Sequence, residues 1–432
     1  MTPSVILLAA GKSTRTWPIR EKIFFSILGK SILQHQIETL LSAGLYEICV
    51  VGNKENISRI QEICAPLPGK FSFAVQENLK EGQRGGILSA ENFTSQEKPV
   101  CIVCSNDIVE NNVFLNLLEK TKKSSTEICL VAKKVESYFP GGYLSVNDSG
   151  RIISIVEKPT PGTEPSNLVS LLIHFYRHPV NLFARLKKRK EGDFYEEILQ
   201  EWFSDGGDAE VLEYSGFWQA IKYPWHFLVL REWFLKSIQQ QEIHPSAQIS
   251  KNAVVRGNVI ISEEARIFDF AVIQGPAYIG KNTIVANHTL VRDSIIENNC
   301  VIGHTTEIAR SIISDSCWTH RNFIGDSVFQ KNVSLGAGTQ TGNLRLDEKE
   351  VSSDIKGEKI NSCLIKFGSI IGENVRIGIN TSIMPGIKIG AESFLGAGGV
   401  CIQDVPENTF LSFTTSEIRK KNTFSVDTRK DF

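Results

Sequence analysis

The chain has 432 residues, with 47 Lys and Arg against 48 Asp and Glu, so its formal net charge is −1 at pH 7. This length predicts two or three domains, and a hydrophobic share of 41% is ordinary for a globular protein. The balanced charge excludes the basic surface on which sequence-independent nucleic-acid binding depends. We therefore expect no nucleic acid among the partners.

The cysteines and the apolar runs bear on where the protein is located. The longest apolar run near the start, residues 5–10, is too short to cross a bilayer and has no basic segment before it. The nine cysteines are an odd number spread over both halves, whereas a disulfide framework would be dense and even. These observations predict a cytoplasmic protein with no membrane partner.

Residues 1–240 alternate short apolar runs with stretches of helical spacing. Apolar strands separated by helices indicate a sheet covered on both faces, so we predict a doubly wound, Rossmann-like α/β domain whose ligand binds beyond the carboxyl ends of the strands. The last helix should pack back on this domain through Val229, Trp233 and Leu235. The predicted strands cover 5–10, 48–51, 99–104 and 128–132, and the predicted helices cover 32–41, 57–63 and 225–240.

Residues 241–410 follow a different pattern, in which an apolar residue recurs at every sixth position. Neither a helix nor a hairpin has this period, but the turns of a parallel β-helix do. We predict a left-handed β-helix of hexapeptide repeats, with register slips near 293–297 and 309–313, a loop over 343–368 and a C-terminal tail over 411–432. The recurring residues are Ile243, Ile249, Val255, Ile261, Ile267, Ile273, Ile279, Val285 and Val291, then Ile371, Ile377, Ile383, Ile389, Leu395 and Cys401.

A turn of small residues follows the first predicted strand, Leu8-Ala-Ala-Gly-Lys-Ser-Thr-Arg15, and Lys22 and Lys30 come after it. Small residues let backbone amides approach an anion, and Arg15 and Lys22 can neutralise phosphate charge. The Gly-Lys-Ser-Thr string alone is also consistent with a plain strand-to-helix turn. The longer stretch resembles the signature of sugar-1-phosphate nucleotidyltransferases, Leu-Ala-Ala-Gly-x-Gly-Thr-Arg, then Pro-Lys and Gly-Lys-Pro with the spacing that Lys22 and Lys30 have here.

The resemblance extends over Gln76–Ala90, Ser105-Asn-Asp107 and Ile155-Val-Glu-Lys-Pro159. In that family a sugar-phosphate oxygen attacks the α-phosphorus of a nucleoside triphosphate, here UTP or dTTP, and pyrophosphate leaves. The resemblance implies that Arg15 and Lys22 are catalytic and that Asp107 binds Mg²⁺. It implies nucleotide contacts from Leu8, Ala9, Ala10, Gly11, Gln76 and Gly82, and sugar-phosphate contacts from Gly142, Glu157, Lys158 and Asn167.

Several positions depart from the family pattern. Gln83 and Arg84 replace Thr-Ala, which is expected to place bulk where the nucleobase would lie, and Ser170-Leu171-Leu172 replaces Asn-Ala-Gly beside the sugar. Ala220 stands where the second carboxylate or amide for Mg²⁺ belongs. Both an active nucleotidyltransferase and a degenerate ligand-binding domain are consistent with these changes.

A second group of motifs interrupts the repeat around His320-Arg-Asn-Phe-Ile-Gly-Asp326 and Asn332–Thr339. A histidine near neutral pKa suits a general base, although such a histidine taken alone is more often a surface or hydrogen-bonded structural residue. The run resembles the acetyltransferase part of the bifunctional GlmU-type enzymes, especially the archaeal branch. That resemblance implies a homotrimer with His320 as the base, Arg292 and Asn343 on the sugar phosphate, and Gly336, Ala337 and Ala397 on acetyl-CoA.

This rear part also departs from the family. Arg310 follows Ala309 where a lysine is expected, Phe323 replaces a tyrosine and Ser334 an asparagine. The leading hypothesis is a sugar-1-phosphate nucleotidyltransferase of UDP-N-acetylglucosamine-type biosynthesis, bifunctional with acetylation of a hexosamine 1-phosphate. The alternatives are an acyltransferase alone, or a regulatory scaffold like the exchange subunits of a eukaryotic translation factor.

Overall fold

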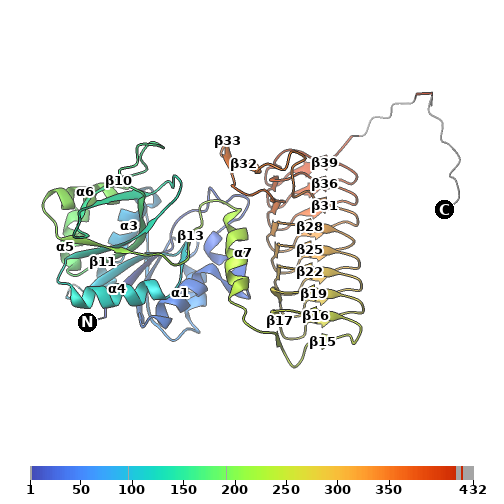
Figure 1. The fold of residues 1–432 in the computed structure, drawn as a ribbon, viewed down its shortest axis with the longest axis horizontal. Helices are drawn as coiled ribbons and strands as arrows, with labels where there is room; N and C mark the ends of the chain where they lie inside the picture. Colours follow the sequence, from blue (N-terminus) through green and yellow to red (C-terminus); the bar gives the residue numbers. More distant parts are fainter. Residues whose placement is uncertain (1, 96, 191, 415–419, 422–432) are drawn as a thin grey trace.

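A computed structural model describes residues 2–95, 97–190, 192–414 and 420–421 of the chain. Two parts lie side by side, an α/β part and a β-helix, with helix α7 (His226–Lys236) between them (Figure 1). Most of the predicted tail, residues 415–419 and 422–432, lies outside the described residues. Within the described ranges, no helix is long and apolar enough to cross a membrane.

The α/β part is built on a nine-stranded mixed sheet. Strands β6, β1, β4 and β5 run parallel in this order, with β5 at one edge, and β11 pairs antiparallel with β6. The sheet strands are β1 (Ser4–Leu8), β4 (Glu47–Gly52), β5 (Lys70–Val75), β6 (Val100–Cys104), β8 (Ile128–Lys134), β9 (Gly142–Val146), β10 (Ile152–Glu157), β11 (Leu168–Tyr176) and β12 (Ala209–Glu213). Two small pairs join β2 (Ser26–Ile27) to β3 (Lys30–Ser31) and β7 (Asp107–Val109) to β13 (Trp218–Ala220).

Helices cover both faces of this sheet. Successive residues of a strand point to opposite faces, so a central strand packs against both layers of helices. In β1, Val5 and Leu7 pack with α1, α2 and α4, whereas Ile6 packs with α3, α5 and α6. The predicted doubly wound domain is confirmed. The helices are α1 (Ile32–Ser42), α2 (Ile57–Cys64), α3 (Gly82–Ser89), α4 (Asn112–Lys123), α5 (Pro179–Leu186) and α6 (Tyr195–Ser204), with short 3₁₀ turns η1 (Lys22–Phe24), η2 (Leu79–Glu81) and η3 (Glu91–Phe93).

The second part is the predicted left-handed β-helix, in which each coil adds one short strand to each of three parallel sheets. Face 1 contains β14 (Glu242–Ile243), β17 (Val259–Ile261), β20 (Ala277–Ile279), β23 (Ile295–Ile296), β26 (Ile312–Ile313), β29 (Val328–Phe329), β34 (Ile370–Ile371) and β37 (Lys388–Ile389). Face 2 contains β15 (Gln248–Ile249), β18 (Arg266–Ile267), β21 (Ile284–Val285), β24 (Val301–Ile302), β27 (Trp318–Thr319), β30 (Ser334–Leu335), β35 (Arg376–Ile377), β38 (Phe394–Leu395) and β40 (Phe410–Leu411). Face 3 contains β16 (Val254–Arg256), β19 (Val272–Gln274), β22 (Leu290–Arg292), β25 (Glu307–Ala309), β28 (Phe323–Gly325), β31 (Gln340–Thr341), β36 (Ser382–Ile383) and β39 (Val400–Cys401).

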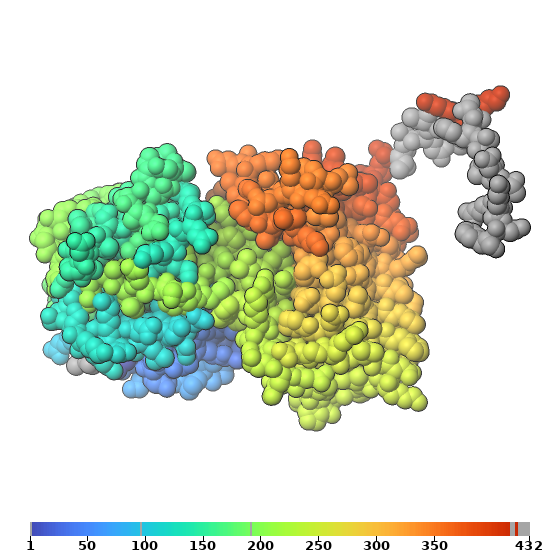
Figure 2. All heavy atoms as spheres, viewed as in Figure 1, coloured from blue at the N-terminus to red at the C-terminus, as the bar shows by residue number. Residues whose placement is uncertain are grey.

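The six-residue pattern corresponds to the interior of the coil, where Ile267, Ile273 and Ile279 belong to one continuous buried cluster. The predicted register slips are shortened coils, because the residue stacked on Val272 is 18 positions later, that on Leu290 is 17 later and that on Glu307 is 16 later. The predicted loop is also present. It carries a hairpin of β32 (Ser352–Ile355) and β33 (Glu358–Asn361), which Figure 2 shows at the top of the molecule, reaching from the β-helix toward the α/β part.

Helix α7 does not pack on the α/β part alone, which corrects the prediction for residues 225–240. Phe227 and Leu230 of α7 share one buried cluster with Tyr278 and Ile295 of face 1. Trp233 stacks on Phe217 of the α/β part, with 4.6 Å between the ring centroids. The helix is apolar on more than one side because it is buried between two partners.

Polar contacts add to this interface. Arg20 of the α/β part lies 3.1 Å from a carboxylate oxygen of Glu373 and 2.7 Å from one of Glu407. The backbone N–H of Gly29 donates to Glu297 over 3.0 Å, and Glu297 is fully buried. These contacts place one side of the β-helix, face 1, against the α/β part.

Candidate active sites

A cavity of about 830 Å³ opens at the carboxyl ends of β1 and β6. It is lined by segments that are far apart in the sequence, as expected for a ligand site of a doubly wound domain. The structure brings together here most of the residues that the sequence predicted for this part. They are Leu8, Ala9, Ala10, Gly11, Arg15, Lys22, Gln76, Gly82, Asp107, Gly142, Glu157 and Lys158.

The turn after β1 is held by side chains of the neighbouring β4–α2 connection. The amides of Asn53 and Asn56 donate to the carbonyl oxygens of Ala10 and Ala9, over 2.9 and 3.0 Å. Lys22 closes the turn, since its backbone N–H donates to Ser13 Oγ over 2.9 Å. Its Nζ donates to the carbonyl oxygen of Ile221 over 2.9 Å, and burial lowers the pKa of this ammonium.

The predicted base-recognition segment is compact. Gln76 donates through Nε2 to the carbonyl oxygen of Gly82 over 2.8 Å. Gly82 has a φ of +50°, and a Cβ there would lie 2.0 Å from Asp193, so only glycine suits the position.

One expectation for this segment is wrong. Gln83 lines the cavity, but Arg84 does not, and its side chain is 4% exposed. Arg84 points to the outer side of α3, where it donates to the carbonyl oxygen of Leu186 over 3.0 Å and pairs with Glu81. The Arg84 side chain therefore does not occupy the cavity, because its guanidinium is bonded on the side of α3 that faces α5.

The opposite wall carries the predicted sugar-phosphate residues. Gly142 pairs with Glu157 across β9 and β10, and Lys158 Nζ lies 2.5 Å from a carboxylate oxygen of Glu157. Burial, and then the nearby Glu157, raise the pKa of Glu196 to about 7. Asn167 is exposed just before β11 and does not line the cavity.

The floor of this wall is a polar network, buried except at Ser170, that the sequence did not predict. His174 shares one ring nitrogen with Ser170 Oγ over 3.0 Å and the other with the hydroxyl of Tyr195 over 2.7 Å. Burial lowers the pKa of His174 to about 3, so it is neutral at physiological pH. Ser170 and Leu172 line the cavity above it.

The far end of the cavity contains the β7–β13 pair, in which Asp107 lies opposite Ala220. Burial raises the pKa of Asp107, while the charges of Lys222 and Lys22 act in the opposite direction. Burial lowers the pKa of Lys222 to about 8. Sequence reasoning missed Lys222, and its only signal was a cation two positions after Ala220.

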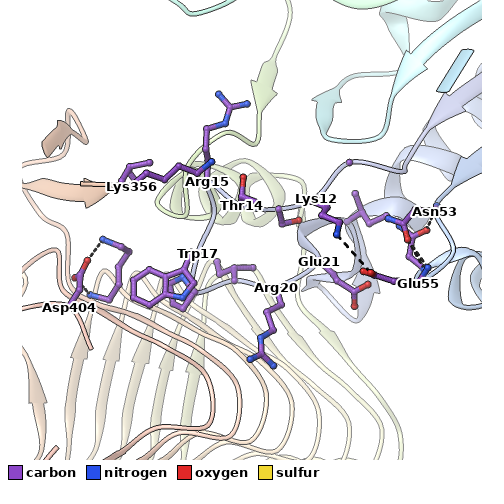
Figure 3. Close-up of a pocket in the computed structure, with 18 of the residues that line it drawn as sticks. Lys12, Thr14, Arg15, Trp17, Arg20, Glu21, Asn53, Glu55, Lys356 and Asp404 are labelled. Carbon is purple, nitrogen blue, oxygen red and sulfur yellow. Dashed lines mark hydrogen bonds and ion pairs between the residues drawn. The ribbon is translucent and has the colours of Figure 1, made fainter. Parts of the chain in front are cut away.

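A second cavity, of about 710 Å³, lies between the turn after β1 and the β-helix (Figure 3). It shares Gly11, Lys12 and Arg15 with the first cavity, and the hairpin contributes Lys356 to it. Lys388, 1% exposed, holds the hairpin by donating to Ser353 Oγ over 2.8 Å and to the carbonyl oxygen of Asp354 over 2.6 Å. The hairpin of the β-helix thus lies next to the turn that was predicted to bind phosphate.

On the β-helix, four predicted residues share the edge between faces 2 and 3. His320 follows β27, Gly336 and Ala337 follow β30 on the next coil, and Ala397 follows β38, two coils further along face 2. His320 and Ala397 are exposed. A Cβ on Gly336 would lie 2.6 Å from the backbone nitrogen of Ile379, so the coils stack tightly along this edge.

Arg292 and Asn343 lie on a different edge, between faces 3 and 1. Arg292 donates from two nitrogens to Glu307, over 3.1 and 2.8 Å. Asn343 donates to Asp326 over 2.6 Å, and Arg310 makes two bonds to the same carboxylate. The width of face 3 separates both residues from His320 within one chain.

Comparisons with known proteins agree with this division. Residues 4–221 match the Nucleotidyl transferase family, residues 237–361 match the GMPPB C-terminal domain, and residues 368–402 match the Bacterial transferase hexapeptide (six repeats).

Three curated archaeal proteins are similar over nearly the whole chain. A bifunctional sugar-1-phosphate nucleotidylyltransferase/acetyltransferase of Sulfurisphaera tokodaii is 31% identical and covers 94% of this chain and 98% of its own. Bifunctional GlmU proteins of Methanococcus maripaludis and Methanocaldococcus jannaschii are 31% and 30% identical, each over 94% of this chain and 96% of its own. The chain therefore belongs to the family of GlmU-type bifunctional nucleotidylyltransferase/acetyltransferase enzymes.

Proposed function

We propose that the α/β part, residues 1–240, transfers a nucleotidyl group from UTP or dTTP to a sugar 1-phosphate. A phosphate oxygen of the sugar attacks the α-phosphorus of the triphosphate, the bond to the β-phosphate breaks, and pyrophosphate leaves. The observation that carries this proposal is the convergence of Arg15, Lys22 and Lys158 on one cavity at the ends of β1 and β6.

The residues divide the work by position. The backbone from Leu8 to Gly11 and the amide of Gln76 line one wall and would hold the nucleotide. Glu157 and Lys158 line the other wall and would hold the sugar and its phosphate. Arg15 and Lys22 would stabilise the charge that develops on the transferred phosphoryl group.

Relatives of this type imply a divalent metal, and we propose that this metal is Mg²⁺. Among the described residues, no group of three or more His, Cys, Asp or Glu side chains could hold a metal ion. Asp107 is a single carboxylate at the cavity end, which fits an ion held mainly by the phosphates of the substrate, because Mg²⁺ commonly binds one or two carboxylates together with phosphates. When bound, such an ion neutralises phosphate charge.

We propose that the β-helix, residues 241–410, transfers an acetyl group from acetyl-CoA to a hexosamine 1-phosphate. The amine attacks the thioester carbon, His320 takes the proton from nitrogen, and the CoA thiolate leaves. The stacked edge at Gly336, Ala337 and Ala397 would hold acetyl-CoA, with His320 at one end of the row.

We further propose a homotrimer. His320 lies on the edge between faces 2 and 3, whereas Arg292 and Asn343 lie on the edge between faces 3 and 1. A threefold arrangement would bring one edge of a chain close to another edge of its neighbour, so that both groups could serve one site. Sedimentation analysis should give three times the chain mass. We also propose that both reactions take place in the cytoplasm.

Two assays on the full-length protein test the proposal. Pyrophosphate release is measured with UTP or dTTP and glucosamine or N-acetylglucosamine 1-phosphate in Mg²⁺, and CoA release is measured with acetyl-CoA and glucosamine 1-phosphate. We expect turnover in both assays. Turnover in the second assay alone would reduce the function to acyl transfer, and turnover in neither would reject the proposal.

A further inference from the structure

Three cations and one carboxylate meet at the far end of the front cavity. Asp107 lies opposite Ala220, so the residue facing it across the strands offers only a methyl group. Lys22 and Lys222 act electrostatically on Asp107, and Arg15 acts on both lysines. Glu157 and Lys158, which pair with each other, also act on Lys222 with opposite sign, so the charge balance here is positive before any substrate is present.

The two lysines approach this end from separate segments. Lys22 belongs to η1 and donates to the carbonyl oxygen of Ile221, over 2.9 Å. Lys222 is the next residue after Ile221, and its Nζ donates to the carbonyl oxygen of Pro140 and lies 3.7 Å from the centroid of the Phe139 ring. An ammonium has three donors, so Lys222 keeps donor capacity for a ligand in the cavity that it lines.

A nucleoside triphosphate brings about four negative charges, and a site can neutralise them with metal ions or with cationic side chains. To the metal route the protein contributes only Asp107, since no second carboxylate or amide lies opposite it and no cluster of three metal-ligating side chains is found among the described residues. The side-chain route is strong, because Lys22, Lys222 and Arg15 all line the same cavity.

We propose that Lys222 binds the polyphosphate of the nucleotide directly and supplies charge that a Mg²⁺ ion would otherwise have to supply. Triphosphate binding to this chain is then largely independent of divalent cations. The inference rests on the proposed nucleotidyl transfer, because it assumes that a triphosphate occupies the front cavity. Nucleotidyl transfer after binding is a separate step, and the inference concerns triphosphate binding alone.

A purely structural role for Lys222 makes a different prediction. If the side chain only braces Pro140, its removal lowers the melting temperature and changes binding equally with and without Mg²⁺. Lys133 offers a matched control, since its Nζ also donates to a backbone carbonyl oxygen, that of Ser215, over 3.2 Å and lies 5.6 Å from the centroid of the Tyr214 ring, outside this cavity.

The test is calorimetric titration of the full-length protein with UTP and, separately, with inorganic pyrophosphate, each in Mg²⁺ and in EDTA. The wild type should bind both probes in EDTA within about tenfold of its affinity in Mg²⁺. Lys222→Met should lose about ten- to a hundredfold in EDTA, as expected for a charge-assisted hydrogen bond, and much less in Mg²⁺. Lys222→Arg should retain binding in EDTA, and Lys133→Met should behave as the wild type.

A double variant exchanges the cationic side chain for a second metal-binding carboxylate. Ala220→Asp combined with Lys222→Met removes the cation and places a second carboxylate opposite Asp107, so its binding should require Mg²⁺. Loss of wild-type binding in EDTA, or equal losses for Lys222→Met in both buffers, would overturn the inference and leave the proposed function standing. If neither probe binds the wild type in any buffer, the proposed function fails, and the inference fails with it.

Discussion

The front cavity and the His320 edge of the β-helix differ in how they bring chemically active residues together. In the cavity, charged residues from distant segments are partly or fully buried, and their pKa values are shifted by burial and by one another. On the edge, residues come from stacked coils of one repeat, and His320 is exposed. One site depends on tertiary placement of charges, whereas the other depends on register.

If the two sites are separate, removing the base of the rear site must leave the front reaction unchanged. His320→Ala should lower acetyl transfer by about 10²- to 10⁴-fold, the usual contribution of a general base, with pyrophosphate release unaffected. Assays of CoA and pyrophosphate release on the same preparation measure both. His304→Ala is the control, because His304 lies one coil earlier on the same edge and should retain acetyl transfer. Equal losses in both variants would remove His320 as the base.

The reciprocal change is made in the front cavity. Lys22→Met should lower nucleotidyl transfer by about 10²- to 10³-fold, as for loss of one group that stabilises transition-state charge, while acetyl transfer continues. Lys30→Met is the matched control, since Lys30 is exposed and pairs with Glu38 over 2.8 Å outside the cavity. A parallel fall in acetyl transfer would show that the two sites are coupled.

The hairpin of the β-helix that lies beside the front part should depend for its stability on one buried lysine. Lys388→Met should destabilise the protein by about 2–4 kcal/mol, because it leaves Asp404 without its buried partner and removes two hydrogen bonds to the hairpin. Thermal unfolding and tryptic cleavage within the hairpin measure the loss. Lys331→Met, at an exposed lysine that pairs with Glu373, should change neither. Unchanged tryptic cleavage of the hairpin in Lys388→Met would show that Lys388 does not hold the hairpin in place.

The smallest effect is expected from the buried carboxylate at the interface. Burial, and then Asp315, raise the pKa of Glu297 to about 8 from its ordinary 4.5. The folded state therefore holds a proton that the unfolded state releases, so stability should fall as pH rises from about 4.5 to 8 and then level off.

Glu297→Gln should remove this decline and exceed the wild type at pH 8 by about 1–4 kcal/mol, since one pKa unit corresponds to about 1.4 kcal/mol. Urea unfolding at pH 5, 6.5 and 8 measures the slope. Glu358→Gln, at an exposed residue of the hairpin, should keep the wild-type slope. A wild-type slope in Glu297→Gln would show that other groups cause the decline.

The same contrast explains what could be predicted from the sequence. Because shortened coils and a loop intervene, the six-residue period does not align His320 with Ala337 and Ala397, but the burial of Ile267, Ile273 and Ile279 inside the coil follows from counting. The orientation of Arg84 does not, because its partners Leu186 and Glu81 are defined only by the packing of α3 on the layer behind it. Lys222 was missed for the same reason, since its neighbour Asp107 is distant in sequence and adjacent only through the β7–β13 pair.

Helix α7 shows a related limit. Its apolar residues predicted burial, but the pattern does not say against which partner, and Phe227 and Leu230 pack against the β-helix. The loop over 343–368 was predicted from its polarity, whereas its hairpin depends on a clamp by Lys388, which is far along the chain. Periodic signals therefore determined the elements, and contacts between distant segments determined where they lie.

The covered face 1 has a consequence for assembly. Because the α/β part of the same chain occupies that side of the prism, a threefold packing of the prisms would have to use faces 2 and 3. Around a threefold axis the α/β parts would then project outward like spokes, each reachable by solvent on its own. Nucleotide turnover in such a particle would stay a property of single chains, and only the central prisms would share their chemistry.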